Sequence, residues 1–153
     1  MMLELHNVTI GQQIRSLSAT VESGQLVGVS GPQGSGKTAL LRAVLGFIPV
    51  DSGHISIDGE LLTPRSAPWF RKQMAYVPQR LSVPDGYEMD TDYLLLLEKA
   101  VRAGKALLLV DEPPQVLDAA GEEAVDRLLH EAAARGAVVL AVNPRITENR
   151  IVL

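Results

Sequence analysis

Short apolar runs alternate along the chain with stretches that repeat apolar residues at helical spacing. Residues 106–110 and 138–142 carry no polar side chain, which is typical of parallel strands buried on both faces. In residues 119–135, the apolar positions Val125, Leu129 and Ala132 fall on one side of a helix. The alternation predicts a single α/β domain over residues 1–153, with a mostly parallel sheet and flanking helices.

The same pattern gives bounds for each element. Strands are predicted at residues 3–10, 17–21, 25–30, 54–58, 74–77, 105–110, 138–142 and 150–153. Helices are predicted at residues 37–45, 94–102 and 119–135. Residues 11–15 are mostly polar and should join the first two strands, which we expect to form a small antiparallel portion at the N-terminal side of the fold.

The most specific motif lies between a predicted strand and a predicted helix. It reads Gly31-Pro32-Gln33-Gly34-Ser35-Gly36-Lys37-Thr38 and fits the phosphate-loop pattern throughout. Glycines allow backbone N–H groups to turn toward phosphate oxygens, and the helix N-terminus adds partial positive charge. We expect Lys37 to reach the β- and γ-phosphates of a nucleoside triphosphate and Thr38 to ligate Mg²⁺. The alternative is a glycine-rich turn that only starts a helix.

A second acidic element suits the same site. Asp111 and Glu112 directly follow the buried run 106–110, at the end of a parallel strand where α/β sheets bind ligands. Asp111 is therefore expected to hold the Mg²⁺ shell, and Glu112 to polarise an attacking water as general base. The alternative is a surface turn with two solvated acids.

Composition narrows the class of protein. The 153 residues are 46% hydrophobic and 21% charged, with no cysteine and a formal net charge of −4. Thiolate chemistry and disulfides are thus excluded, and extensive nucleic-acid binding is not expected. The longest apolar stretches are far below a membrane span, so we expect a cytoplasmic protein. His6, His54 and His130 show no metal-ligand spacing, which indicates incidental surface positions.

Further segments follow the two motifs in a fixed order. These are Ser52–Gly59, Ala75–Gln79, and Asp111–Pro113 followed by Leu117-Asp118. With this series the chain resembles the nucleotide-binding subunit of ATP-binding-cassette (ABC) ATPases, from Met1 to Asp118 and more loosely through Val142.

The resemblance assigns a role to each motif. It implies that residues 31–38 bind the phosphates of ATP and that Gln79, in the glutamine loop, contacts Mg²⁺ or the attacking water. It also implies that Asp111 serves the metal, Glu112 the water, and Asp118 a dimer contact.

The chain departs from the family where catalysis is completed. Residues 80–110 alone separate Gln79 from Asp111, so the helical subdomain of the family is nearly absent, and no LSGG-type signature occurs in the sequence. The signature position falls on residues 87–91, in an acidic segment that would repel the γ-phosphate of a second subunit. A solvated loop is the favoured interpretation of these acids, and a partner-binding role is the alternative. Pro144 stands at the family's switch histidine, and residues 1–24 hold no aromatic for stacking on adenine.

Three functions follow as hypotheses. The first is an ATP-binding ABC-type protein, hydrolysing slowly or only with a partner that supplies the missing signature. A full-length ABC subunit or a membrane permease would be that partner, and the chain would then lie at the inner face of a membrane; an ordinary homodimer is not expected. The second is a nucleotide-sensing or scaffolding protein without turnover, which Pro144 favours and Glu112 disfavours. A small-molecule kinase is disfavoured, because its lid position is acidic here rather than arginine-rich.

Overall fold

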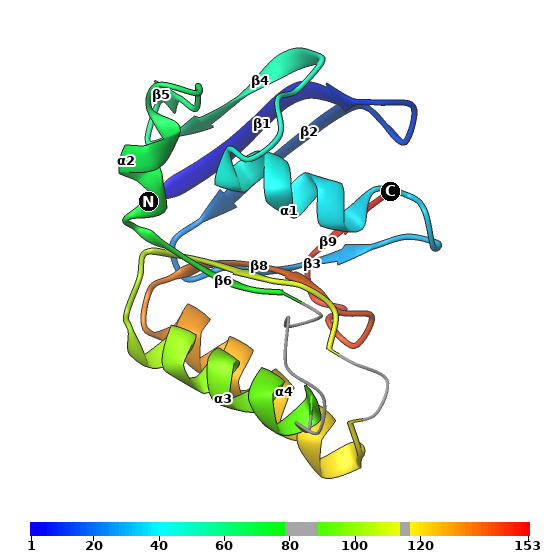
Figure 1. Cartoon of the computed structure of the whole chain (residues 1–153), viewed down its shortest axis with the longest axis vertical. Coiled ribbons are helices and arrows are strands. Elements are labelled where there is room, and N and C mark those ends of the chain that lie inside the picture. Colours follow the sequence, from blue (N-terminus) through cyan, green and yellow to red (C-terminus); the bar gives the residue numbers. More distant parts are fainter. Residues whose placement is uncertain (79–88, 114–116) are drawn as a thin grey trace.

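Two sheets and a helix between them form the upper part of the molecule, and two further helices form its base (Figure 1). The computed structural model describes residues 1–78, 89–113 and 117–153. A small antiparallel sheet packs on α1 (Lys37–Leu45), and α1 in turn covers one face of a parallel sheet. The opposite face of the parallel sheet carries α3 (Met89–Arg102) and α4 (Ala119–Ala134).

The antiparallel sheet has the strand order β2-β1-β4-β5. Its strands are β1 (Met2–Ile10), β2 (Ile14–Glu22), β4 (Ser52–Ile57) and β5 (Glu60–Leu61). Leu3 and Leu5 in β1 and Ile55 and Ile57 in β4 point into the core, whereas Glu4 and its register partner Ser56 lie on the other face, where Ser56 is also buried. One face of this sheet is therefore apolar and the other polar, as alternation along a half-buried strand requires.

The parallel sheet has the strand order β6-β7-β8-β3-β9. Its strands are β6 (Met74–Val77), β7 (Leu107–Val110), β8 (Val138–Val142), β3 (Leu26–Ser30) and β9 (Arg150–Val152). In β7, Leu107 and Leu109 pack on the α1 side, and Leu108 and Val110 pack on the α3 and α4 side. Burial on both faces explains why this strand has no polar residue.

The predicted α/β arrangement and antiparallel portion are confirmed, and the differences lie at element ends. β2 begins at Ile14 rather than residue 17, because Ile14 is buried and pairs with Ile10 across the hairpin. The helix α3 begins at Met89 instead of residue 94. Two elements had no prediction: β5, which has two residues, and α2 (Ala67–Arg71), which has five. In the described part of the chain, no helix is long and apolar enough to cross a membrane.

Candidate functional site

The phosphate-loop motif lies at the carboxyl end of the parallel sheet, between β3 and α1. Gly36 is the N-cap of α1 and has φ +96°, a left-handed conformation that side chains rarely adopt. A Cβ at this position would also lie 3.1 Å from the Ile14 Cγ1 atom and 3.2 Å from the Gln13 Cβ atom. The start of β2 therefore closes against the loop, and only glycine allows the helix to begin there.

Two polar side chains of the loop are placed to meet an anion. The Lys37 Nζ atom donates to the Gly31 carbonyl oxygen over 2.7 Å, so its ammonium group lies against the loop. The Ser35 Oγ atom is buried and has no hydrogen-bond partner in the described protein. Because buried polar atoms nearly always have a partner, this hydroxyl fits a loop that accommodates a polar ligand.

Asp111 contacts the loop from the end of β7, which lies on the other side of β8 from β3. It follows β7, its side chain is buried, and its Oδ2 atom accepts a hydrogen bond of 2.9 Å from the Thr38 hydroxyl. Its Oδ1 atom accepts from the Glu112 amide over 2.8 Å, which fixes the carboxylate orientation and keeps Glu112 beside it. A hydroxyl and a carboxylate in contact form an oxygen pair of the kind that Mg²⁺ prefers.

Two tyrosines lie near the negative charge of this site. The buried Tyr93 hydroxyl donates to the Asp111 carbonyl oxygen over 2.7 Å. Burial raises the pKa of Tyr93 above its ordinary value, and the charges of Asp111 and Glu112 raise it further. Burial also raises the pKa of Tyr76, again with a contribution from Asp111. Tyr93 thus helps to hold the Asp111 backbone, a role that its place in a leucine-rich helix did not reveal.

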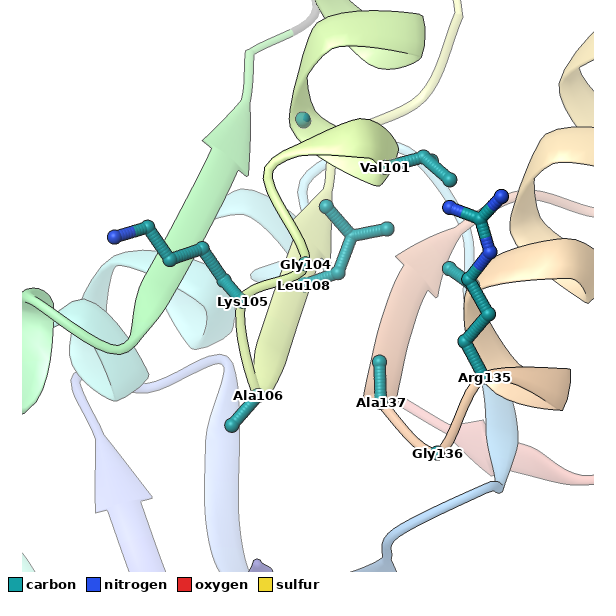
Figure 2. Close-up of a pocket in the computed structure, with 10 residues that line it drawn as sticks. Val101, Gly104, Lys105, Ala106, Leu108, Arg135, Gly136 and Ala137 are labelled. Atoms are coloured by element: carbon teal, nitrogen blue, oxygen red, sulfur yellow. The ribbon is translucent and has the colours of Figure 1, made fainter.

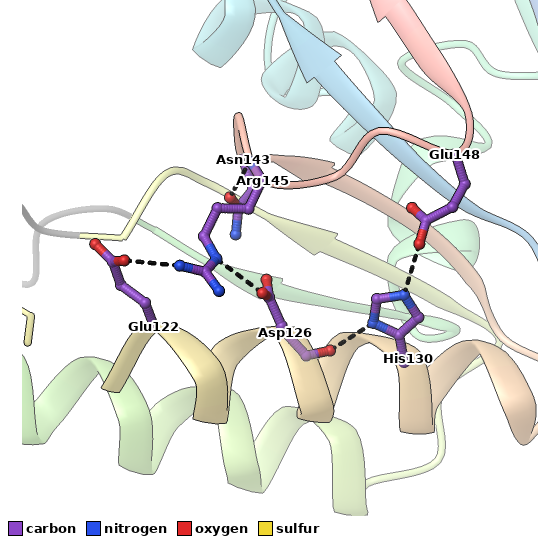
Figure 3. A network of polar contacts seen from close by, with 6 residues as sticks. All are labelled: Glu122, Asp126, His130, Asn143, Arg145 and Glu148. Atoms are coloured by element: carbon purple, nitrogen blue, oxygen red, sulfur yellow. Dashed lines mark hydrogen bonds and ion pairs between the residues drawn. The ribbon is translucent and has the colours of Figure 1, made fainter. Parts of the chain in front are cut away.

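The charged groups of the segment after β8 contact α4 (Figure 3). Asn143 is buried at the end of β8, and its Oδ1 atom accepts from the Arg145 amide over 3.0 Å. The Arg145 guanidinium reaches two carboxylates of α4, Asp126 at 2.8 Å and Glu122 at 3.0 Å.

A histidine of α4 extends this network. The His130 ring contacts the Asp126 carbonyl oxygen at 2.7 Å and the Glu148 carboxylate at 3.1 Å. The Asp126 carbonyl oxygen is the largest cause that raises the pKa of His130, and Glu148 adds to the increase. Arg145 and Glu148 therefore attach residues 143–148 to α4 (Figure 3).

Not every predicted position can be placed. Gln79 and residues 87–88 of the signature position lie outside the described residues, and Met89 is the start of α3. Asp118, for which the resemblance implies a dimer contact, is the N-cap of α4, and its Oδ1 atom accepts from the Gly121 amide over 2.8 Å.

A pocket of about 140 Å³ lies at the opposite edge of the parallel sheet (Figure 2). It is lined by the residues that lead into β7 and β8, Gly104–Ala106 and Arg135–Ala137 among them. Its two cations already have partners within the chain: Lys105 donates to the Lys72 carbonyl oxygen and Arg135 pairs with Glu131. Parallel sheets bind ligands at the carboxyl ends of their strands, so the phosphate-loop edge is the candidate site.

Comparisons with known proteins agree with this geometry. A family model described as ABC transporter matches residues 14–136. The zinc import ATP-binding protein of Cereibacter sphaeroides is 32% identical over 162 residues, covering 85% of this chain and 65% of that protein. The manganese transport system ATP-binding protein of Bacillus subtilis is 39% identical over 85 residues, covering 53% of this chain and 32% of that protein. The chain thus spans from about a third to just under two thirds of the length of these relatives.

Solved structures extend the likeness to the whole chain. A structure described as the ATP-binding subunit of an ABC transporter has a TM-score of 0.85 at 18% identity, and the match covers 100% of this chain and 86% of that one. A putative ABC transporter ATP-binding protein from Pyrococcus furiosus gives 0.72 at 17% identity, over 100% of this chain and 98% of that one. At these identities the structures establish the fold.

Proposed function

The chain belongs to the ABC transporter family, and from this premise we propose that it binds ATP and Mg²⁺ at the phosphate loop. The observation that carries the proposal is the 2.9 Å contact between the Thr38 hydroxyl and the Asp111 carboxylate. These residues lie far apart in the sequence, and the contact between their side-chain oxygens supports a shared Mg²⁺ site, since Mg²⁺ prefers oxygen ligands.

The remaining residues of the motif then have defined tasks. The backbone amides of residues 31–36, apart from Pro32, would be the phosphate donors, and Lys37 would exchange its bond to the Gly31 carbonyl oxygen for one to a phosphate oxygen. Thr38 and Asp111 would hold Mg²⁺, joined by Gln79 as the family resemblance implies. When bound, Mg²⁺ neutralises charge on the phosphate oxygens.

Glu112 extends the proposal from binding to hydrolysis. Its carboxylate follows the metal ligand directly, and its amide is bonded to Asp111, so the side chain is held at the same edge of the sheet. A general base at this position would take a proton from water attacking the γ-phosphate. We assign this role to Glu112. Hydrolysis should be slow, or should need a partner protein, because Pro144 can neither donate to the phosphate nor orient the water.

A partner protein would complete the site. Phe47, Leu61 and Trp69 are large apolar side chains that are more than half exposed, at 60%, 53% and 54%. Phe47 also lines a pocket of about 450 Å³ with Ile48, Val50 and Leu62, between the end of α1 and the antiparallel sheet. Exposed apolar surface of this kind favours a protein contact. We propose a full-length ABC subunit or a membrane permease as the partner, which would place the chain at the inner face of a membrane.

A sensor or scaffold without turnover is the second candidate. The attachment of Arg145 to Glu122 and Asp126 favours it, because the segment that follows Pro144 is bonded to α4 rather than directed toward the loop. In that case ATP would change the stability or the partner affinity of the chain, and Glu112 would have no catalytic task.

Phosphate release distinguishes the two candidates. We expect slow release from Mg-ATP by the wild type, lost in Glu112→Gln and retained in Glu123→Gln, which makes the same change at an exposed position of α4. The assay is repeated with a full-length ABC subunit, which should increase the rate. Binding of Mg-ATP without release in either condition would support the sensor, and equal release by both variants would remove Glu112 from the reaction.

A further inference from the structure

Two histidines that are distant in the sequence lie opposite each other on the antiparallel sheet. His6 of β1 and His54 of β4 are register partners, and their rings stack with centroids 4.5 Å apart and planes inclined by 26°. Both side chains lie on the outward face, since their neighbours Leu5 and Ile55 are buried. The sequence predicts incidental surface positions for these histidines, whereas the fold pairs them.

The backbone beside the pair fixes the spacing of the two strands. Gly53 has φ +75°, and a Cβ there would lie 2.1 Å from the Asn7 carbonyl oxygen and 2.4 Å from that of His6. Any side chain at position 53 would therefore separate the strands next to the histidines. Directly opposite residues of an antiparallel pair have Cβ atoms about 4.5–5.5 Å apart, a spacing that two imidazoles can bridge to one ion.

Glu4 lies beside one ring nitrogen of His6. Its Oε2 atom is 3.0 Å from the His6 Nε2 atom, on the same face of β1. With Nε2 facing this carboxylate, Nδ1 is the His6 nitrogen that can bind an ion. A carboxylate behind a histidine is the usual arrangement around metal-bound imidazoles, because it sets the tautomer and increases ligand basicity.

We propose that His6 and His54 bind one divalent ion of the zinc, nickel and copper class, with Glu4 as the positioning residue. Imidazole nitrogen suits these ions, whereas the oxygen ligands Thr38 and Asp111 suit Mg²⁺. Among the described residues, no three His, Cys, Asp or Glu side chains form a metal-binding group, and the proposed site has two protein ligands. The ring planes are inclined by 26°, and the exposed His54 ring would have to turn for both nitrogens to lie about 2.0–2.1 Å from one ion.

A zinc titration of the full, untagged chain tests the proposal, with Mg²⁺ in excess so that the phosphate loop is not the site observed. Competition with a chromophoric chelator should show one Zn²⁺ per chain, bound at least tenfold more weakly by His6→Asn and by His54→Asn. His130→Asn is the matched control, because His130 also pairs with a glutamate but lies on α4. Its zinc affinity should equal that of the wild type.

Two further variants separate this site from the nucleotide site. Asp111→Asn should bind Zn²⁺ as the wild type does, whereas Glu4→Gln should weaken binding about tenfold and shift the ring ¹⁵N resonances of His6. Zn²⁺ should broaden or shift the ring signals of His6 and His54 and leave those of His130 unchanged. Equal affinity in the wild type, His6→Asn and His54→Asn, or loss of binding only in Asp111→Asn, would overturn the proposal.

Discussion

Two segments leave the same edge of the parallel sheet and use their polar groups in opposite ways. Residues 31–38, after β3, carry a buried hydroxyl that has no partner within the described residues and a lysine that donates to a backbone carbonyl. Residues 143–148, after β8, direct Arg145 to two carboxylates of α4. The first segment has polar groups that a ligand could engage, as proposed above, whereas the charged groups of the second are engaged in contacts within the chain.

This difference separates the binding of nucleotide from its rapid hydrolysis. Asp111 lies with the first segment, bonded to Thr38, so the groups proposed to hold phosphate and metal lie together. Pro144 begins the turn that leads to Arg145 and carries no donor. A chain built in this way should retain nucleotide affinity and depend on other groups for rapid turnover.

Lys37→Ala should have the largest effect on the first segment. We expect ATP affinity to fall about ten- to hundredfold, because a hydrogen bond from a charged donor contributes about 1.5–3 kcal/mol. Lys105→Ala is the matched control, since the Lys105 Nζ atom also donates to a carbonyl oxygen, at the opposite edge of the sheet. Calorimetric titration measures both, and similar affinities would contradict the assignment of the loop.

Tyr93→Phe tests whether the buried Tyr93 hydroxyl holds the backbone at Asp111 in place. It should lower the free energy of unfolding by about 1–3 kcal/mol, because the Asp111 carbonyl oxygen would lose its partner in a buried place. Urea unfolding with an unchanged m-value measures the loss. A change below about 0.5 kcal/mol would show that Tyr93 does not hold this backbone.

Glu148→Gln should alter the titration of His130, the α4 residue that Glu148 of the second segment contacts. The pKa of His130 is raised by the Asp126 carbonyl oxygen and then by Glu148, so the variant should lower this pKa while leaving it above the ordinary value. A raised histidine pKa stabilises the fold below about pH 6.5, and this contribution is lost as the pH rises through the folded pKa. Proton NMR of the His130 ring follows the shift, and an unchanged titration would exclude the contact.

Arg145→Gln should produce the smallest change. Its ion pairs are exposed, so the melting temperature should fall less than in Tyr93→Phe. Affinity for Mg-ATP should equal that of the wild type, because Arg145 is bonded to α4. A clear loss of ATP affinity would mean that the second segment also serves the ligand and would remove the contrast between the two.

Local signals explain what could be predicted from the sequence. The bounds of α1 follow from Gly36 and Gly46, which adopt left-handed conformations at its two ends, and the strands β7 and β8 follow from their apolar composition. The loop and Asp111 could be assigned to one site because parallel strands end at the same edge.

The contacts that could not be predicted join residues without any local pattern. The bond from Tyr93 to Asp111, the bonds from Arg145 to α4 and the stacking of His6 on His54 all depend on packing between separate elements. β5 and α2 are too short for a periodic signal. Glu122 and Asp126 read only as polar positions of a helix until the segment after β8 is placed beside them.

The central claim is that this edge of the sheet holds the β- and γ-phosphates of ATP with Mg²⁺. Its most direct test is the thermal stability of the wild type with Mg-ATP, Mg-ADP and AMP, each at about a hundredfold excess over the dissociation constant of Mg-ATP. Mg-ATP should add about 2.7 kcal/mol, a shift of several degrees, and omission of Mg²⁺ should reduce it. AMP, which lacks both phosphates, should give no shift. No shift with Mg-ATP, or an equal shift with AMP, would contradict the claim.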